Sequence, residues 1–267
     1  MTTLEREIWD DSRERGLLYT GIGVGLGGLA GVLVRSTTVA TAIALGAGSL
    51  RSVALEIGSY LEAGEIEDAR NKLPWLVGRD PSGLDESGIA AAVIESVAEN
   101  TVDAVVAPLF WALVGGAPGV LAYRAINTMD AMVGHHSERF ENFGWASARL
   151  DDIANFVPAR VFGAATRIVR RDRAEEISRA VSLDAPAHPS PNAGLAEAAV
   201  AGALGIELGG TLRYGDRIEH RPLLGRGDRP QAKSIGEAVD VVDDAAWFAL
   251  GITGLAIGLA SYVTERR

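Results

Sequence analysis

The stretch Gly16–Val34, GLLYTGIGVGLGGLAGVLV, decides the fold, because it holds nineteen uncharged residues between Arg15 and Arg35. An α-helix of about 20 apolar residues is long enough to span the hydrocarbon core of a bilayer. The charged lead of residues 1–15 is too long and too acidic to resemble a cleaved signal peptide. We therefore expect a retained membrane helix, with a buried helix of a soluble protein as the alternative interpretation.

Four further apolar segments lie outward from this one, at residues 36–57, 104–123, 193–210 and 245–263. Pro108 and Pro118 predict that the second of them is broken or kinked, and broken helices in membranes usually line a site. Glu197 and Glu207 make the third at best a buried or re-entrant helix. Each of the five segments is expected to be a membrane segment of a multi-pass bundle.

Two polar regions, residues 62–103 and 124–191, are expected to form a layer of helices and loops outside the lipid. The second is rich in arginine from Arg160 to Arg179, which places it on the cytoplasmic side by the positive-inside rule. The segment 215–233 is rich in Arg, Gly and Pro and is expected to be a loop. The sequence thus predicts an all-α fold, a single multi-pass membrane domain over residues 1–267.

Composition excludes several classes of function. Asp and Glu outnumber Lys and Arg by 35 to 25, a net charge of −10 that is unfavourable for binding nucleic acid. The chain has no cysteine, so thiolate catalysis, disulfides and cysteine-ligated metals are excluded.

Three local signals have plainer interpretations than their motifs suggest. Gly23-x-Gly25-x-x-Gly28 matches a dinucleotide fingerprint but lies inside the apolar span. The pairs Gly21/Gly25, Gly23/Gly27 and Gly27/Gly31 offer helix-packing faces there. His135-His136 and the loop residues His188 and His220 lack partners at metal-ligand spacing. The arginines from Arg167 to Arg179 are expected to form a solvated helix face, with phosphate or lipid-headgroup contact as the alternative.

The first motif that carries chemistry is ESVAENTVD at residues 95–103. On a helix, Glu95, Glu99 and Asp103 share one face, and like charges at this spacing repel. Near a membrane the remedy is a bound divalent cation or paired arginines. A solvated helix face is the alternative.

Two further motifs are YRAINTMD at residues 123–130 and RLDDIANFVPAR at residues 149–160. On a helix, Asp151 and Asn155 share a face, and Arg149 pairs with Asp152 at i+3. Two acids and an amide within five residues, Asp151, Asp152 and Asn155, suit Mg²⁺ that keeps sites open for substrate phosphates. Arg149 and Arg160 offer forked donors for phosphate or carboxylate. Together the motifs predict a site for an ATP–Mg²⁺ reaction on an acidic substrate. No Walker A motif is present, which excludes ordinary P-loop chemistry.

These motifs resemble the CobD/CbiB family. The resemblance covers most of residues 16–263 and is carried by AR at 69–70, VGRD at 77–80, ESVAEN at 95–100, APLF at 107–110, YRAINTMDAMVG at 123–134, FG at 143–144, ARLDD at 148–152, PAR at 158–160 and SPNAG at 190–194. It implies a multi-pass enzyme of the cell membrane that acts in cobalamin biosynthesis, an acid–amine ligase of the adenosylcobinamide-phosphate synthase type.

The implied reaction uses ATP and Mg²⁺ to join aminopropanol O-phosphate to a propionate side chain of adenosylcobyric acid. The implied partners are these substrates and the lipid bilayer, together with a second copy of the chain or other membrane proteins of the cobamide pathway. The expected catalytic residues are Glu95, Glu99, Asn100, Asp103, Arg149 and Asp152. The expected substrate-binding residues are Arg79, Asp80, Tyr123, Arg124, Asn127, Asp130, Asn155, Arg160 and Asn192. The expected metal ligands are Glu99, Asp103, Asp151 and Asp152.

Some features depart from the family pattern. Family members usually begin with a further segment that carries an Asp-rich stretch and a His-Pro-Val motif, and this chain starts after it. The usual aromatic residue after Gly134 is His135 here, and the following Tyr is Phe140. The superfamily also includes an ampicillin-regulation membrane protein. A membrane transport or regulatory protein that uses the same acidic site for an ion or ligand is therefore the alternative function.

Overall fold

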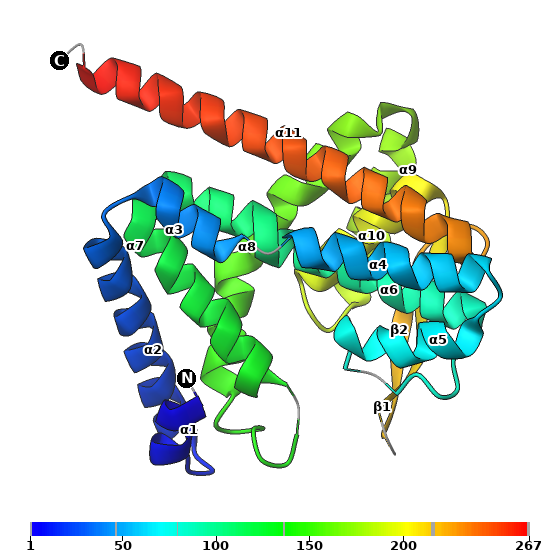
Figure 1. The fold of residues 1–267 in the computed structure, drawn as a ribbon, viewed down its shortest axis with the longest axis horizontal. Helices are drawn as coiled ribbons and strands as arrows, with labels where there is room; N and C mark the ends of the chain where they lie inside the picture. The colour runs from blue at the N-terminus through cyan, green and yellow to red at the C-terminus, as the bar shows by residue number, and fades with distance from the viewer. Residues whose placement is uncertain (1, 46, 79, 136, 215–216, 266–267) are drawn as a thin grey trace. The chain divides into compact units, whose positions relative to one another are not determined.

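The computed structural model describes residues 2–45, 47–78, 80–135, 137–214 and 217–265, and the side chains of these residues except at 2, 47, 212–219 and 256–265. The chain divides into two compact units. The first comprises residues 1–45, 106–158 and 252–267, and the second comprises residues 46–105 and 159–251. Helices α8 (Trp145–Val169) and α11 (Ala232–Glu265) contribute residues to both. The predominantly helical fold expected from the sequence is confirmed (Figure 1).

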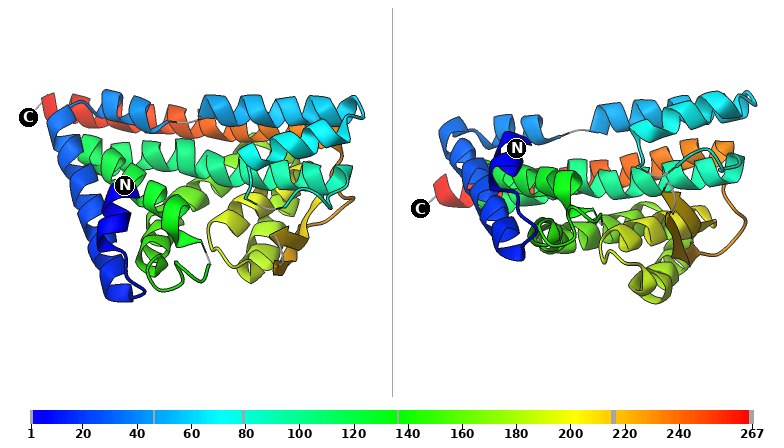
Figure 2. Two further views of the ribbon diagram at one scale, coloured as in Figure 1. Left: turned by 60° about the horizontal axis from the view of Figure 1, so that its bottom comes forward. Right: turned by 90° about the horizontal axis from the view of Figure 1, so that it is seen from below.

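The first unit contains α1 (Thr2–Ile8), α2 (Arg13–Val34), α3 (Thr37–Ala44) and α7 (Ala107–Met129). Ser12 caps α2 by accepting a hydrogen bond from the Arg15 amide at 3.3 Å. The predicted span over 16–34 is therefore part of one continuous helix. It lies beside α7 in every view (Figures 1 and 2).

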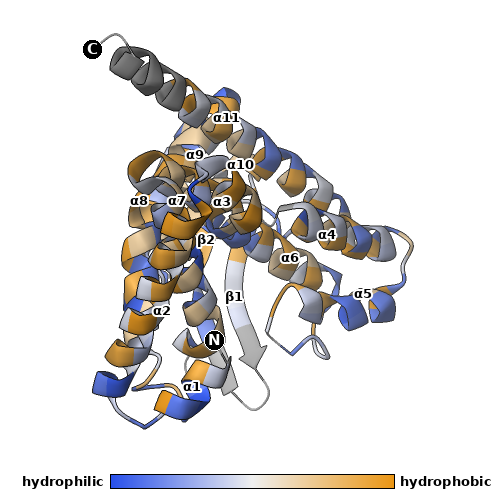
Figure 3. Ribbon diagram, turned by 60° about the vertical axis from the view of Figure 1, so that its left-hand side comes forward, coloured by the Kyte–Doolittle hydropathy of each residue, from blue (hydrophilic) through white to orange (hydrophobic). Residues whose placement is uncertain are grey.

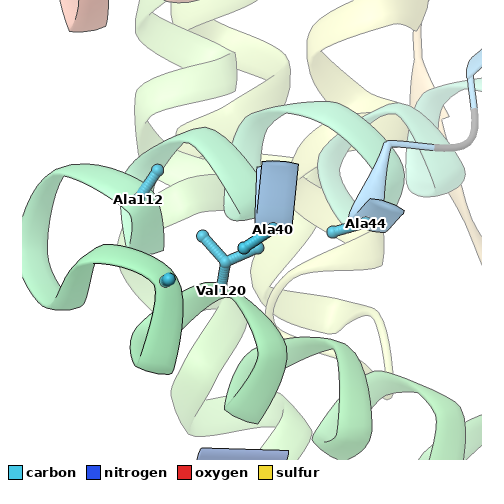
Figure 4. Packing of buried hydrophobic residues seen from close by; sticks show 5 residues of the cluster. Ala40, Ala44, Ala112 and Val120 are labelled. Carbon is cyan, nitrogen blue, oxygen red and sulfur yellow. The ribbon is translucent and has the colours of Figure 1, made fainter. Parts of the chain in front are cut away.

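Small residues set how closely α2 and α7 approach. A Cβ atom at Gly27 would lie 2.6 Å from the Leu121 carbonyl oxygen, and one at Gly31 would overlap the Ala117 carbonyl. This confirms helix packing as the role of Gly27 and Gly31, whereas a Cβ atom at Gly21, Gly25 or Gly28 would meet no atom within 4 Å. Helix α3 packs on α7 through a second set of small side chains, which includes Ala40, Ala44, Ala112 and Val120 (Figure 4).

The predicted break in the segment 104–123 is also confirmed. Residues 102–106 form a π-helical turn, and α7 is kinked at Gly116, whose φ of 57° and ψ of −150° are not helical. Pro118 lies two residues after the kink. Proline has no amide N–H to donate to the preceding turn, so it favours a break in the helix here.

In the second unit, α4 (Ala47–Glu62), α5 (Ile66–Lys72) and the short helix Leu73–Trp75 precede α6 (Glu86–Thr101). The chain then continues from α8 through α9 (Ala174–Arg179), the π-helical turn Ala180–Asp184 and α10 (Ala193–Leu204). Arg51 of α4 pairs with Asp243 of α11 at 2.8 Å. Helix α6 packs on α4 and α10. Short 3₁₀ turns at Arg171–Arg173 and Ala185–Ala187 complete this region.

A β-hairpin corrects the expectations for residues 193–233. Helix α10 ends at Leu204, and β1 (Glu207–Tyr214) pairs antiparallel with β2 (Arg217–Gly225). The end of the predicted segment 193–210 is therefore strand, and much of the predicted loop 215–233 is strand as well. In the sequence, Gly209, Gly210 and Pro222 indicate only a break in a helix. In the structure, both glycines lie where the register of the β1–β2 pairing shifts, between Leu208 and Gly210.

Three helical stretches of the described chain are long and apolar enough to cross a membrane, namely Arg13–Val34, Thr37–Glu62 and Glu86–Gly134. On α2, Leu29 and Leu33 are 56% and 72% exposed, which is expected of side chains that face lipid. Hydrophobic residues predominate along much of α2, α3 and α7 (Figure 3). The predicted segment 245–263 lies in α11, and its side chains from residue 256 onward are outside the described part.

Candidate functional site

A hydrogen-bonded polar network centres on Asp151 in the first unit. The Asn155 side-chain amide donates to Asp151 Oδ2 at 2.9 Å, and the Asn127 amide approaches Asp151 Oδ1 at 3.5 Å. The Tyr123 hydroxyl donates to Asn155 Oδ1 at 2.9 Å, and Arg124 Nη1 donates to Asn127 Oδ1 at 3.2 Å. Residues of the second and third sequence motifs therefore meet in one network between α7 and α8.

Helical spacing explains how each motif supplies its part. Asn155 follows Asp151 by one turn of α8, so their side chains are neighbours on the helix surface. Asn127 likewise follows Arg124 by three residues on α7. Tyr123 and Asn155 are buried, with 1% and 2% of their surface exposed. Their polar atoms are satisfied by each other and by Asp151, as buried polar groups require.

The electrostatics of this network favour a cation. Burial, and then the nearby charge of Asp130, raise the pKa of the Asp151 carboxyl to about 7, although hydrogen bonds from Asn155 and Asn127 lower it. Burial also raises the pKa of Asp152, and Arg149 opposes that shift. Arg149 Nη1 lies 3.8 Å from Asp152 Oδ2 and is mostly exposed. The Asp130 and Asp151 carboxyl groups thus approach each other where Asp151 is buried from water, and a bound cation would relieve their repulsion.

Asp130 begins a π-helical turn, Asp130–Gly134, at the end of α7. The Asp130 carboxylate occupies the space that a Cβ atom would take at Gly134. Isolated π-helical turns are frequent at functional sites. Because glycine has no side chain, Gly134 leaves room for the Asp130 carboxylate in this turn.

The donor set fits Mg²⁺. Among the described residues, no group of three or more His, Asp or Glu side chains could hold a metal ion. Mg²⁺, however, is usually bound by one or two carboxylates with waters and substrate phosphates. Asp130 and Asp151 offer such a pair of carboxylates, and the Asn127 amide nitrogen lies beside Asp151 Oδ1. Asp152, also predicted as a metal ligand, lies 3.8 Å from Arg149, as their i,i+3 spacing predicts.

The acidic motif of α6 belongs to the second unit, and its acids have different surroundings. Glu95 is buried, and its Oε1 accepts a hydrogen bond from the Gly209 amide of the hairpin at 2.9 Å. Glu99 is exposed, while Asp103 is half-buried in the π-helical turn 102–106. The Asn100 amide donates to the Ser96 carbonyl at 2.8 Å. Glu95 thus anchors the hairpin to α6.

The remaining predicted residues of the second unit are dispersed. Asp80 accepts a hydrogen bond from the Ser82 amide at 3.0 Å, in a turn, and Arg79 lies outside the described residues. Arg160 Nη1 donates to Asn192 Oδ1 at 3.4 Å. Burial lowers the pKa of Arg160, so its guanidinium is partly removed from water. Asn192 directly precedes α10.

Sequence reasoning missed a buried cluster around His188. Arg221 of β2 donates from Nη1 to His188 Nε2 at 2.8 Å, and Glu197 Oε2 lies 3.7 Å from the same ring nitrogen. His188 and Glu197 are 6% and 3% exposed. The one signal in the sequence was Glu197 itself, a charge inside an otherwise apolar helix. The cluster ties the hairpin to the loop that carries Asn192.

The fold and these polar networks define a multi-pass helical membrane protein with carboxylates and arginines beside its apolar helices. The CobD/Cbib protein family matches residues 3–242, and the chain belongs to that family. It is therefore a protein of cobalamin biosynthesis.

Three relatives illustrate the similarity, each described as "Cobalamin biosynthesis protein CobD". The protein of Mycobacterium tuberculosis (strain CDC 1551 / Oshkosh) is 45% identical over 249 residues, which cover 88% of this chain and 80% of the relative. That of Stutzerimonas stutzeri (strain A1501) is 47% identical, covering 79% and 67%. That of Rhodobacter capsulatus is 44% identical, covering 77% and 64%. No solved structure matches the chain.

Proposed function

We propose that the chain is an ATP-dependent acid–amine ligase. It joins the amine of aminopropanol O-phosphate to a propionate side chain of adenosylcobyric acid and gives adenosylcobinamide phosphate. Membership in the family and the relatives' role in cobalamin biosynthesis support this proposal. The observation that carries it is the Asp130–Asp151 carboxyl pair, held beside Arg124 and the Asn127 amide.

The chemistry requires activation of a carboxylate. The propionate oxygen attacks the terminal phosphorus of ATP, and ADP leaves. The amine nitrogen then attacks the resulting acyl phosphate at its carbonyl carbon. The carbon–oxygen bond breaks, inorganic phosphate leaves, and the amine nitrogen loses a proton to a base. Each step concentrates negative charge on phosphate oxygens, which fixed cations and donors stabilise.

The polar network suits these requirements. Asp130 and Asp151 would hold Mg²⁺, which supplies charge neutralisation at the transferring phosphoryl group. Arg124 and Arg149 carry planar forks of donors that match phosphate oxygens. Tyr123 and Asn155 keep Asp151 in position through their hydrogen bonds. Glu99, exposed on α6, is a further candidate for the reaction.

The decisive experiment incubates the purified protein in detergent with ATP, Mg²⁺, adenosylcobyric acid and aminopropanol O-phosphate. We expect adenosylcobinamide phosphate and ADP in equal amounts, detected by mass spectrometry and nucleotide chromatography. Release of AMP instead would indicate an adenylate intermediate. Binding of the corrinoid without ATP-dependent consumption would favour the transport or regulatory alternative.

A further inference from the structure

The loop between α7 and α8, residues 135–144, joins the two elements that carry Asp130 and Asp151. Asp130 begins the π-helical turn that precedes this loop, and Asp151 lies in the second turn of α8. All residues of the loop except 136 are described. The path of the loop therefore constrains where Asp130 lies relative to Asp151.

The two ends of this loop pack against each other. A Cβ atom at Gly144 would overlap the Val133 carbonyl, and one at Gly134 would lie 3.4 Å from the Ala148 Cβ. The π-helical turn thus contacts the first turn of α8 directly. Because closely packed groups transmit strain, a shift of the loop should also move the turn that carries Asp130.

The N-terminal strap, defined here as residues 5–11, holds the loop through Arg139. Arg139 Nη2 donates to Glu5 Oε1 at 2.7 Å, and Trp9 Nε1 donates to the Arg139 carbonyl oxygen at 3.3 Å. The guanidinium carbon of Arg139 also lies 5.1 Å from the centre of the Trp9 ring. Arg139 is therefore bound to the strap by both its side chain and its backbone.

A second contact joins the strap to the end of the loop nearer α8. Asn142 Nδ2 donates to Asp11 Oδ1 at 3.0 Å. The strap thus contacts the loop at two separate residues. Two such contacts restrict the orientation of the loop as well as its position.

The Glu5–Arg139 ion pair is the contact most costly to lose. The Glu5 side chain is only 10% exposed, whereas that of Arg139 is 54% exposed. Fully exposed ion pairs contribute little to stability, but removing the cation from a buried carboxylate is strongly unfavourable. Burial of Glu5 therefore makes this pair an effective anchor for the loop.

We propose that the strap positions the α7–α8 loop, which makes Arg139 a positioning residue for the Asp130–Asp151 pair. Without this anchor, the loop and the π-helical turn packed on it would carry Asp130 away from Asp151. The role of that pair as a metal site rests on the proposed function, whereas its positioning by the strap can be tested separately.

Spin-label distances test the positioning directly. The chain has no cysteine, so Ala131→Cys on the π-helical turn and Ile153→Cys on α8, both exposed, can be labelled specifically. Electron paramagnetic resonance of the full-length protein in detergent should give a narrow distribution of distances between the two labels. Arg139→Gln should broaden that distribution about twofold, because the packed loop is released. The same narrow distribution in both proteins would overturn the proposal.

Arg6→Gln is the matched control, because Arg6 is an exposed residue of the same strap. It removes the same positive charge and leaves the Glu5 and Trp9 contacts in place, so the distribution should stay narrow. Equal broadening in Arg6→Gln and Arg139→Gln would contradict the proposal. Arg139→Lys can still donate to Glu5 and should restore most of the narrow distribution. A distribution as broad as that of Arg139→Gln would refute the role of the ion pair.

A milder variant keeps the test valid if Arg139→Gln does not accumulate. Trp9→Phe removes one hydrogen bond to the Arg139 carbonyl and keeps an aromatic ring. It should broaden the distribution in the same way but to a smaller extent. An unchanged distribution in this variant would remove Trp9 from the strap contact.

Metal binding gives a readout in which charge and position act in opposite directions. Mn²⁺ alone is titrated into the parent and into Arg139→Gln. Loss of a positive charge near a cation site should by itself strengthen metal binding. Loss of positioning should instead weaken it about threefold or more, because the two carboxylates no longer converge on the ion. Tighter or equal binding in Arg139→Gln, when the parent binds Mn²⁺, would overturn the proposal.

Turnover and label distances together separate this inference from the proposed function. Arg139→Gln should raise the Mg²⁺ concentration for half-maximal activity and leave the KM for adenosylcobyric acid unchanged. A higher KM for the phosphate-bearing amine with an unchanged Mg²⁺ requirement would mean that Arg139 contacts the substrate, and the proposal would be wrong. Label distances that depend on Arg139, in a protein that binds no Mn²⁺ or makes no amide, would support the positioning and refute the reaction. Amide formation with label distances insensitive to Arg139 would do the reverse.

Discussion

The Tyr123 hydroxyl donates a hydrogen bond to Asn155 Oδ1 at 2.9 Å, and this fixes which way the Asn155 amide faces. With its oxygen engaged by Tyr123, the amide must direct its nitrogen toward Asp151. A tyrosine on α7 thus controls a hydrogen bond within α8.

Tyr123→Phe tests this control. The variant leaves the buried Asn155 oxygen without its donor, which should cost about 1–3 kcal/mol of stability. It should also lower kcat, because Asp151 loses its fixed amide donor. Thermal melting and steady-state kinetics measure the two effects. Tyr60→Phe, which removes a hydroxyl bonded to Glu56 on α4, is the matched control and should retain the parental kcat.

Asp151 should make stability depend on pH in metal-free buffer. The folded pKa of about 7 lies above the ordinary value of 3.8. Its stabilising contribution is therefore fully present below about pH 4 and is lost as the pH rises through 7. Burial of Asp152 adds a loss of the same sign.

Asp151→Asn should therefore flatten the decrease in melting temperature between pH 5 and pH 8, whatever its absolute stability. The measurement is a set of melting curves with a chelator present. In the parent, Mg²⁺ should restore stability at pH 8, and in the variant it should not. Parallel pH profiles for the two proteins would contradict this explanation.

Arg149→Lys tests the need for a planar fork of donors. The substitution keeps the charge near Asp152 but loses bidentate hydrogen bonding to phosphate. Because Arg149 is two-thirds exposed in its ion pair, folding should be unaffected. We expect normal expression, with KM values for ATP and the phosphate-bearing amine raised about tenfold or more. Unchanged kinetics would reduce the Arg149–Asp152 contact to a simple intrahelical ion pair.

Glu95 and Glu99 should respond differently to the same substitution. Glu99→Gln alters an exposed side chain, so the protein should accumulate in membranes and lose turnover. Glu95→Gln weakens the bond to the Gly209 amide and should lower the melting temperature as well. Full activity in Glu99→Gln would assign that residue to a solvated helix face.

Gly134→Ala should displace the Asp130 carboxylate, because the added methyl group occupies its place. The expected result is a higher Mg²⁺ concentration for half-maximal activity. Gly28→Ala is a suitable control, since no heavy atom lies within 4 Å of the added Cβ. A similar Mg²⁺ requirement in all three proteins would exclude Asp130 from the metal site.

The membrane helix and the kink could be predicted because their causes are local. Nineteen uncharged residues define α2, and Pro118 marks the disruption in α7. The hairpin could not be predicted, because strand pairing depends on a partner segment. From the sequence, Gly209 and Gly210 indicate only the end of a helix. Predictions from spacing therefore succeeded within single helices.

In the candidate site, too, contacts within one helix could be predicted, and contacts between elements distant in sequence could not. Helical periodicity placed Asn155 beside Asp151 correctly, but it could not show that Asp130 of the π-helical turn approaches Asp151. That approach arises from the packing of α7 against α8. His188 was discounted for the same reason, since Glu197 and Arg221 reach it from a helix and a strand distant in sequence.

The burial of α10 within the protein affects how many times the chain is taken to cross the bilayer. Its twelve residues rise only about 18 Å, less than the roughly 30 Å of a hydrocarbon core, and Ala193–Ala203 are buried by protein. Every true crossing reverses the side on which the following residues emerge. An apolar helix counted wrongly as a crossing would therefore invert the parity of everything after it, including the hairpin. Reporters inserted before Ala193 and after Leu204 should thus report the same side of the membrane.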